Sequence, residues 1–287
     1  MRGVAARRPR STERICRKLG MTRQNFYKAR KERKRRENRD DLVLALVRQE
    51  RETNPRAGTK KLLHAIRPEL ERAGVRIGRN RLGTLLKRNG LLVEKRKSFR
   101  CRTTRRDPSL PPSPNRVKDM AIDAPGKAVC SDITYIYTDE GFLYLALVMD
   151  MFTRYVAGYA VRGTLGTEGP LAALEMAARE LGKGGGVVAH SDRGCQYAAR
   201  AYRALLEELG WVSSMTEELH CYENAMAERL NGILKGEYFL DRRFKTKAEA
   251  IAAVEEAIRV YNHRRLHEKL GYKTPAQFKA EWGKKAA

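Results

Sequence analysis

The net positive charge of this chain belongs entirely to one end, and that partition constrains the fold more than any other feature of the sequence. Residues 1–120 contain 37 Lys and Arg against 12 Asp and Glu, whereas residues 121–287 contain 22 of each. The whole net charge of +25 therefore belongs to the first 120 residues. A basic half beside a neutral half predicts a polyanion-binding region joined to a region of another kind. Because Arg outnumbers Lys there and suits phosphate, nucleic acid is the expected polyanion.

Several other classes of protein are excluded. The longest stretch without a charged residue is nine residues, 141–149, whereas a membrane span needs about 18 apolar residues. The basic amino terminus lacks the apolar stretch of a secretory signal. Five cysteines lie far apart, the nearest two 26 positions from each other, so neither a disulfide framework nor a CxxC zinc site is expected. We expect a reduced, cytoplasmic protein without a membrane partner.

The basic half is predicted to be all helical. Residues 11–30 indicate two short helices about Gly20, and residues 28–41 a solvated charged helix. A second helix pair is expected over 59–73 and 79–89. These are helix-turn-helix candidates in a DNA-binding region, although helical hairpins with charged outer faces give the same pattern. The basic residues expected to contact DNA are Arg79, Arg81, Lys87 and Arg88.

A proline-rich junction separates the two halves. Four of the ten prolines fall between residues 108 and 114, which is typical of an extended linker. We therefore expect two domains, residues 1–114 and residues 115–287.

The second half has the pattern of an α/β domain. Strands are expected at 128–136, 142–151, 155–161, 187–191 and 211–215, and helices near 169–181, 198–209 and 224–238. Three strands followed by alternating helices and strands predict a mixed five-stranded sheet covered by helices.

Three carboxylates have unusual contexts. Asp132 lies within an apolar strand, Asp192 directly follows a buried strand, and Glu228 lies on a predicted helix, with 35 residues between the last two. A charged residue in an apolar strand needs a partner or a function, and α/β sheets place their sites at the carboxyl ends of strands. Carboxylates suit Mg²⁺ or Mn²⁺, and two such ions can stabilise attacking and leaving oxygens. Each acid alone could equally be an ordinary surface carboxylate.

Several longer sequence motifs narrow the protein families to which the chain can be compared. They are SDITYI, LVMDMFTRYVAGY, HSDRGCQYAA, SSMTEELHCYENAMAERLNG and YNHRRLHEKLGYKTPAQF in the second half, and PRAGTKKLL and VRIGRNRLGTLLKRNGLL in the first. With these motifs the chain resembles insertion-sequence transposases related to retroviral integrases, the DDE group with a ribonuclease-H-like catalytic core. Those transposases are usually encoded in two overlapping frames, and this chain resembles the downstream product.

The resemblance implies an activity and a set of site residues. Asp132, Asp192 and Glu228 match the metal-binding catalytic acids, with two Mg²⁺ as cofactor and Mn²⁺ as an expected substitute. Asn231 and Lys235 match positions that approach DNA. The implied reaction cleaves an element end and joins its 3′-OH to DNA by direct transesterification. The implied partners are double-stranded DNA, as terminal inverted repeats and as target, and further copies of the chain in at least a dimer.

Four alternatives stand beside this interpretation. Glu223 is the only serious rival to Glu228, because the family commonly has Asp there, and its role stays open. His263 and His267 have the i,i+4 spacing of a zinc pair but no supporting ligands, so we expect structural or DNA-facing roles. The whole chain could also be a metal-dependent nuclease of the same fold. Finally, it could be a non-catalytic DNA-binding regulator from a decayed element.

Overall fold

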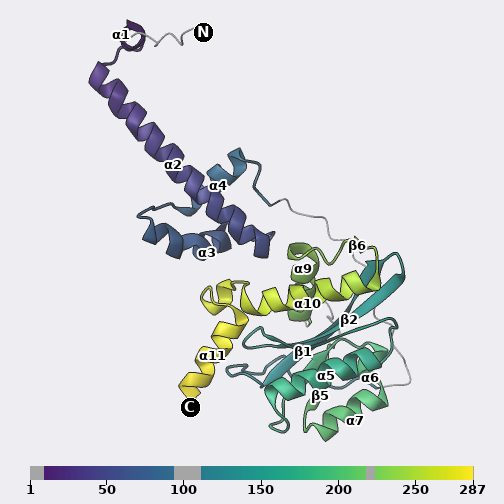
Figure 1. The fold of residues 1–287 in the computed structure, drawn as a ribbon. Helices are drawn as coiled ribbons and strands as arrows, with labels where there is room; N and C mark the ends of the chain where they lie inside the picture. The colour runs from purple at the N-terminus through teal and green to yellow at the C-terminus, as the bar shows by residue number, and fades with distance from the viewer. Residues whose placement is uncertain (1–9, 94–110, 218–223, 287) are drawn as a thin grey trace. The chain divides into compact units, whose positions relative to one another are not determined.

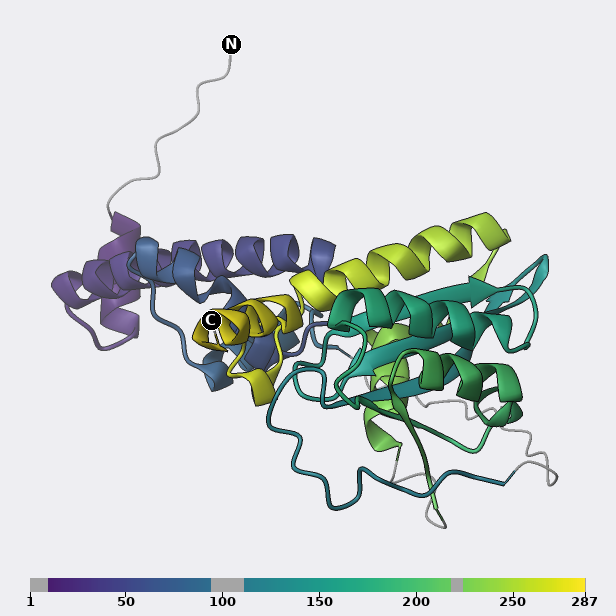
Figure 2. The same ribbon diagram turned by 90° about the horizontal axis from the view of Figure 1, so that it is seen from below.

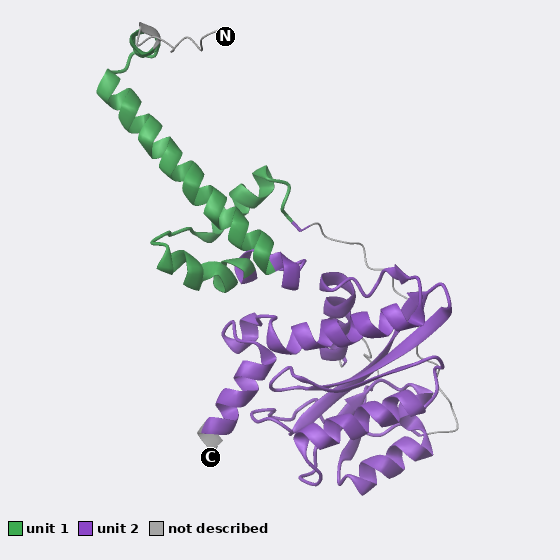
Figure 3. Ribbon diagram, in the orientation of Figure 1, with its two compact units in different colours: residues 1–50, 62–92 green, residues 51–61, 93–287 purple. Residues whose placement is uncertain are grey.

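The chain contains two compact units. A computed structural model describes residues 10–93, 111–217 and 224–286 (Figure 1). One unit comprises residues 1–50 and 62–92, and the other comprises residues 51–61 and 93–287 (Figure 3). Among the described residues, no helix combines the length and apolarity that crossing a bilayer requires. Much of the proline-rich junction, over 94–110, lies outside the described residues.

Four helices form the amino-terminal region: α1 (Arg10–Lys18), α2 (Arg23–Thr53), α3 (Thr59–Arg72) and α4 (Arg79–Arg88). The turn between α1 and α2 contains Gly20, whose φ of 61° favours glycine. The prediction of a short second helix followed by a separate charged helix is wrong, because both lie in α2, which is continuous for 31 residues. No Gly or Pro interrupts α2, and Pro55 and Gly58 follow its end.

Apolar spacing on these helices supplies the buried residues of the first unit. The buried apolar residues are Cys16, Val43, Leu44, Val47, Leu62, Ile66, Leu70, Leu82 and Leu86. The i, i+4 repeat of leucine and isoleucine on α3 and α4 places these side chains on one face of each helix. On α4 the basic residues Arg79, Arg81, Lys87 and Arg88 lie exposed, outside this buried face.

A mixed sheet forms the centre of the second unit. Its strands are β1 (Ala128–Thr138), β2 (Gly141–Asp150), β3 (Val156–Arg162), β4 (Val188–Ser191) and β5 (Val212–Met215), in the order β3-β2-β1-β4-β5. β1 pairs antiparallel with β2 across a tight turn, and parallel with β4. A sixth strand, β6 (Arg243–Phe244), adds two residues beside β1. The five predicted strands are therefore present, in a sheet of six.

Helices cover both faces of this sheet (Figures 1 and 2). The helices are α5 (Glu168–Leu181), α6 (Cys195–Ala198), α7 (Arg200–Glu208), α9 (Ala225–Glu237), α10 (Lys247–His263) and α11 (Pro275–Ala286), with a 3₁₀ turn η1 (Glu268–Leu270). One core packs α9 and α10 on the side of Cys130 and Ile136, and the other packs α5 and α7 on the side of Val129 and Ile133. Because successive side chains of β1 point to opposite faces of the sheet, this strand contributes residues to both cores.

Two local features determine how the helices pack against β3. Gly158 on β3 allows close approach of α5, because a β-carbon there would lie 2.0 Å from the carbonyl oxygen of Ala173. On the other face, Asn262 of α10 accepts from the backbone N–H of Val156 at 2.9 Å and donates to its carbonyl at 3.0 Å. Asn262 therefore replaces a missing strand neighbour at the start of β3.

Candidate active site

Asp132 lies on β1, and Asp192 directly follows the neighbouring parallel strand β4. The β1–β4 register pairs Cys130 with His190, and each aspartate follows two residues beyond that pair. Residues two apart on a strand point to the same face, so the parallel register brings the two carboxylates to the same level of the sheet. Their electrostatic interaction agrees with this placement, since the charge of Asp192 acts directly on Asp132.

Asp132 is held by two hydrogen bonds. Its Oδ1 accepts the backbone N–H of Ile133 at 2.9 Å, and its Oδ2 accepts Nδ2 of Asn231 at 2.7 Å. Burial, and after it the negative charge of Asp192, raise the pKa of Asp132 to about 7, with a smaller contribution from Glu228. Asp192 and Glu228 are therefore both within electrostatic reach of Asp132.

Asp192 begins the turn that follows β4. Its Oδ1 accepts the backbone N–H of Gly194 at 3.0 Å, an arrangement typical of an aspartate turn. A β-carbon on Gly194 would lie 3.0 Å from the same oxygen, so the residue after Arg193 must be small for this turn to close. The turn leads directly into α6 and fixes Asp192 at the carboxyl end of the strand, where the sequence predicted it.

Helix α9 brings Glu228 and Asn231 to the sheet. Glu228 lies exposed in its first turn, and Asn231, one turn later, is 8% exposed and bonded to Asp132. Asn224, just before the helix, is buried and donates from Nδ2 to the carbonyl of Ser131 at 3.3 Å. Asn224 was not among the predicted site residues, although an Asn directly before a helix is a recognisable signal. Two amide side chains thus attach the amino-terminal half of α9 to β1.

The predicted DNA-contacting residues occupy several environments. Asn231 donates to Asp132, and its Oδ1 is buried with no hydrogen-bond partner in the part of the chain that the structure describes. Lys235 Nζ lies 6.0 Å from the ring centroid of Tyr135. On α4, Arg79, Lys87 and Arg88 are exposed, whereas Arg81 NH2 lies 3.0 Å from Asp40 Oδ1.

The carboxylates fit a divalent cation by their chemistry. Asp192 and Glu228 both act on Asp132 with negative charge, and a cation bound between these acids would offset that repulsion. Within residues 10–93, 111–217 and 224–286, no three His, Cys, Asp or Glu side chains lie close enough to form a ligand cluster. Glu223, the rival third acid, lies outside the described residues.

Other reactive side chains are used structurally. Tyr197 is 2% exposed, and burial, together with Asp132, raises its pKa well above 10, so its hydroxyl is not accessible to DNA as a nucleophile. His263 ends α10, and His267 lies beyond the helix with its Nε2 2.9 Å from Arg265 NH1. These two histidines therefore do not form a zinc pair on one helix face.

Comparisons with known proteins show that the second half of the chain is similar to integrase core domains. Two models described as "Integrase core domain" match residues 123–221 and 209–275. The HTLV-2 integrase catalytic core domain, solved in complex with magnesium, has a TM-score of 0.44 and 19% identity over 54% of this chain and 97% of that one. The simian T-cell lymphotropic virus intasome gives a TM-score of 0.48 and 18% identity over 78% of this chain and 70% of that one.

The integrase-core match and the strand order define the class: a polynucleotidyl transferase with a ribonuclease-H-like catalytic unit. The "Insertion element IS600 uncharacterized 31 kDa protein" of Shigella sonnei is 34% identical over 95% of this chain and 100% of its own length. The transposase for insertion sequence element IS629 from the same organism is 32% identical over 92% and 89%, and transposase InsF for IS3A of Escherichia coli is 30% identical over 93% of each. The chain belongs to the insertion-sequence transposases.

Proposed function

We propose that this transposase cleaves the ends of its mobile element and joins the exposed 3′-OH to DNA, using Asp132, Asp192 and Glu228 to hold two Mg²⁺ ions. Bound divalent ions supply stabilisation of the attacking and leaving oxygens. The observation that carries the proposal is that the charges of Asp192, in the turn after β4, and of Glu228, on α9, both act on Asp132 of β1. Mn²⁺ is expected to replace Mg²⁺, because both are hard ions that prefer oxygen ligands.

Each residue has a distinct task in this proposal. Asp132 feels the charges of both other acids, and each of its oxygens accepts one hydrogen bond. A carboxylate oxygen has two lone-pair directions, so each oxygen would retain one for a cation. Asp192 and Glu228 would supply the other acidic ligands. Asn231 fixes the orientation of the Asp132 carboxylate and is also expected to approach the DNA.

DNA binding is assigned by charge. We infer that residues 1–114 hold the terminal inverted repeats, with Arg79, Arg81, Lys87 and Arg88 contacting phosphates, and that residues 115–287 carry out the chemistry. Lys235, on the same helix as Glu228, is expected to contact the DNA beside the site. The two ends of the element must be brought together for joining to the target DNA, so at least a dimer is expected.

The test compares single-residue variants in cleavage, strand-transfer and end-binding assays. Asp132→Asn, Asp192→Asn and Glu228→Gln are each expected to abolish cleavage while leaving end binding largely intact, because loss of one ligand disrupts an ion site. Glu223→Gln serves as the comparison and should be milder. An active Glu228→Gln beside an inactive Glu223→Gln would overturn the choice of third acid. Cleavage without any joined product would favour a nuclease.

A further inference from the structure

The carboxyl end of α9 is capped by residues that precede or begin α3 in the sequence. The guanidinium of Arg56 donates from NH1 to the carbonyl of Gly236 at 3.2 Å and lies 5.2 Å from the ring centroid of Phe239. The last carbonyls of a helix have no partner within the helix and carry its partial negative charge. A cation that bonds one of these carbonyls therefore stabilises the end of α9.

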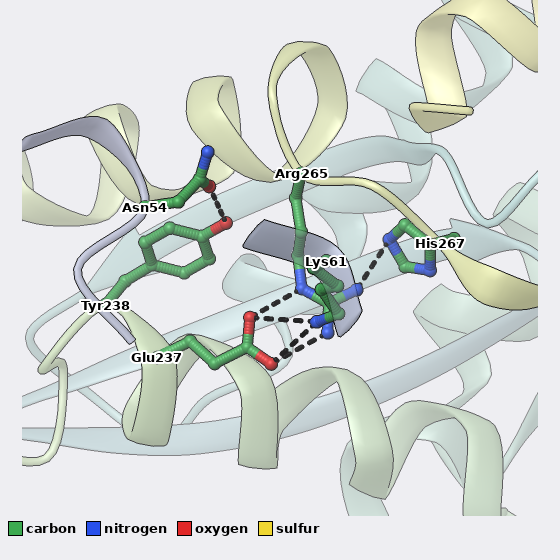
Figure 4. Close-up of polar contacts among 6 residues, drawn as sticks. All are labelled: Asn54, Lys61, Glu237, Tyr238, Arg265 and His267. Atoms are coloured by element: carbon green, nitrogen blue, oxygen red, sulfur yellow. Dashed lines mark hydrogen bonds and ion pairs between the residues drawn. The ribbon is translucent and has the colours of Figure 1, made fainter. Parts of the chain in front are cut away.

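A partly buried charge cluster holds the next residue of the helix (Figure 4). Arg265, 4% exposed, donates two hydrogen bonds to Glu237, from Nε to Oε2 at 2.7 Å and from NH2 to Oε1 at 2.8 Å. Lys61 Nζ lies 3.1 Å from Oε1 of the same carboxylate. Burial alone would raise the pKa of Glu237, but Arg265 and Lys61 outweigh it and hold that pKa below 4.5. Glu237 is thus a charged anchor shared by two cations.

A third contact completes the set. Tyr238, just after α9, donates from its hydroxyl to Oδ1 of Asn54 at 3.2 Å, and Asn54 is 7% exposed (Figure 4). Positions 236 to 239 are therefore each contacted by Asn54, Arg56 or Lys61, which we name the α9 cap. Arg51–Lys61 belongs to the same compact unit as α9, although the sequence places it between helices of the basic half.

The cap acts on the helix that carries the catalytic acid. Glu228 and Glu237 are nine residues apart on α9, about 13.5 Å at 1.5 Å per residue. Asn224 and Asn231 attach the amino-terminal half of α9 to β1, and the cap holds its carboxyl end. A helix held at both ends cannot slide or tilt without breaking one of these attachments, so the cap restricts where Glu228 lies relative to Asp132.

We propose that the α9 cap positions Glu228 and Asn231 for DNA cleavage, and that Lys61 and Arg56 are positioning residues supplied to the catalytic unit by the basic half of the chain. The proposal rests on the proposed role of Glu228. It also gives a function to the YNHRRLHEKLGYKTPAQF motif, whose Arg265 forms the cluster with Glu237. Because α3 begins at Thr59, inside this segment, and continues into the first unit, the helix that supplies Lys61 also belongs to the basic half.

Lys61→Met in the full-length protein is the most direct test. Met keeps the apolar stem and removes the ammonium group, while the two Arg265–Glu237 hydrogen bonds remain, so the fold should survive. We expect unchanged binding of end DNA, single-turnover cleavage at least about tenfold slower, and a severalfold higher Mg²⁺ concentration for half-maximal rate. Lys61→Arg should restore most of the rate. The matched control is Lys60→Met, because Lys60 is the adjacent lysine and its Nζ lies 2.9 Å from Oε1 of Glu268 on the surface; it should behave as wild type.

The outcomes separate positioning from stability. A Lys61→Met protein that melts earlier but cleaves at the wild-type rate, with the wild-type Mg²⁺ dependence, overturns the proposal, as does an equal loss in Lys60→Met. If Lys61→Met does not fold, Arg56→Gln is judged by the same readouts. Glu228→Gln is run alongside: if it cleaves normally, the proposed function itself fails, whereas an inactive Glu228→Gln beside a normal Lys61→Met refutes the cap alone.

Discussion

His267 should make the catalytic unit lose stability in mild acid. Its Nε2 lies 2.9 Å from Arg265 NH1, and a guanidinium nitrogen can only donate, so the imidazole must accept and be neutral. The cations Arg265, Lys61 and Arg154 and the anion Glu237 act on this ring. Burial first, and then the charges of Arg265 and Lys61, lower the pKa of His267 to about 3 from 6.5.

The sign and size of the effect follow from proton linkage. Below pH 6.5 the unfolded chain binds a proton at His267, whereas the folded chain does not bind this proton until the pH falls to about 3. The contribution to stability is therefore complete above pH 6.5 and is lost as the pH falls toward 3, at about 1.4 kcal/mol per pH unit. Between pH 7.5 and pH 5.5 the unfolded imidazole goes from about 10% to about 90% protonated, so the expected loss is about 1.4 kcal/mol.

The assay is urea unfolding at the two pH values, for wild type and His267→Gln. Gln still offers Arg265 an acceptor oxygen but does not titrate, and the other four histidines contribute equally to both proteins. Both tryptophans, Trp211 and Trp282, lie in the unit that contains His267, so their fluorescence follows that unit. Wild type should lose about 1.4 kcal/mol more than the variant. Equal losses in the two proteins would refute the argument that His267 is held neutral.

Three further predictions concern metal, DNA and packing. Cleavage should need Mg²⁺ or Mn²⁺ and not zinc; full activity in EDTA, or stoichiometric zinc in purified protein, would contradict this. Replacing Arg79, Arg81, Lys87 and Arg88 with Ala should reduce the slope of log affinity against log salt by about 0.9 for each phosphate that the variant no longer neutralises. The same change at four exposed basic residues of the catalytic unit, Arg179, Lys183, Arg242 and Arg259, should leave that slope unchanged. Equal slopes in the two variants would count against the assignment of DNA contacts to α4. Gly158→Ala should destabilise the catalytic unit by at least about 2 kcal/mol in the tryptophan assay, because its β-carbon would meet a backbone oxygen at 2.0 Å. Gly163→Ala, with nothing within 4 Å of the new carbon, is the control, and equal stability of the two variants would refute the packing argument.

The sequence by itself determined the parts that depend on local pattern. Alternating and continuous apolar runs predicted the five main strands, and strand and helix context selected Asp132, Asp192 and Glu228. The charge partition predicted a basic helical region ahead of a neutral α/β unit. Each of these signals is contained within a few turns or strands of the chain, where the spacing of side chains is fixed by the geometry of the element.

Local sequence pattern did not predict the structure where it depended on the continuity of a helix or on contacts between residues far apart in the sequence. The charged run that follows the second predicted helix has no periodic apolar signal, which suggested two helices where α2 is one, although no residue in it breaks a helix. The bond from Asn231 to Asp132 joins positions 99 apart in sequence, and the contact of Lys61 with Glu237 joins positions 176 apart.

Only the tertiary structure could decide these contacts, because a carboxylate and an ammonium group attract one another strongly only after folding has removed the water between them. Lys61 stands in the sequence as one more cation of the basic half. In the folded chain it lies partly buried against Glu237, where desolvation and the neighbouring Arg265 lower its pKa and the helix that carries Glu228 ends.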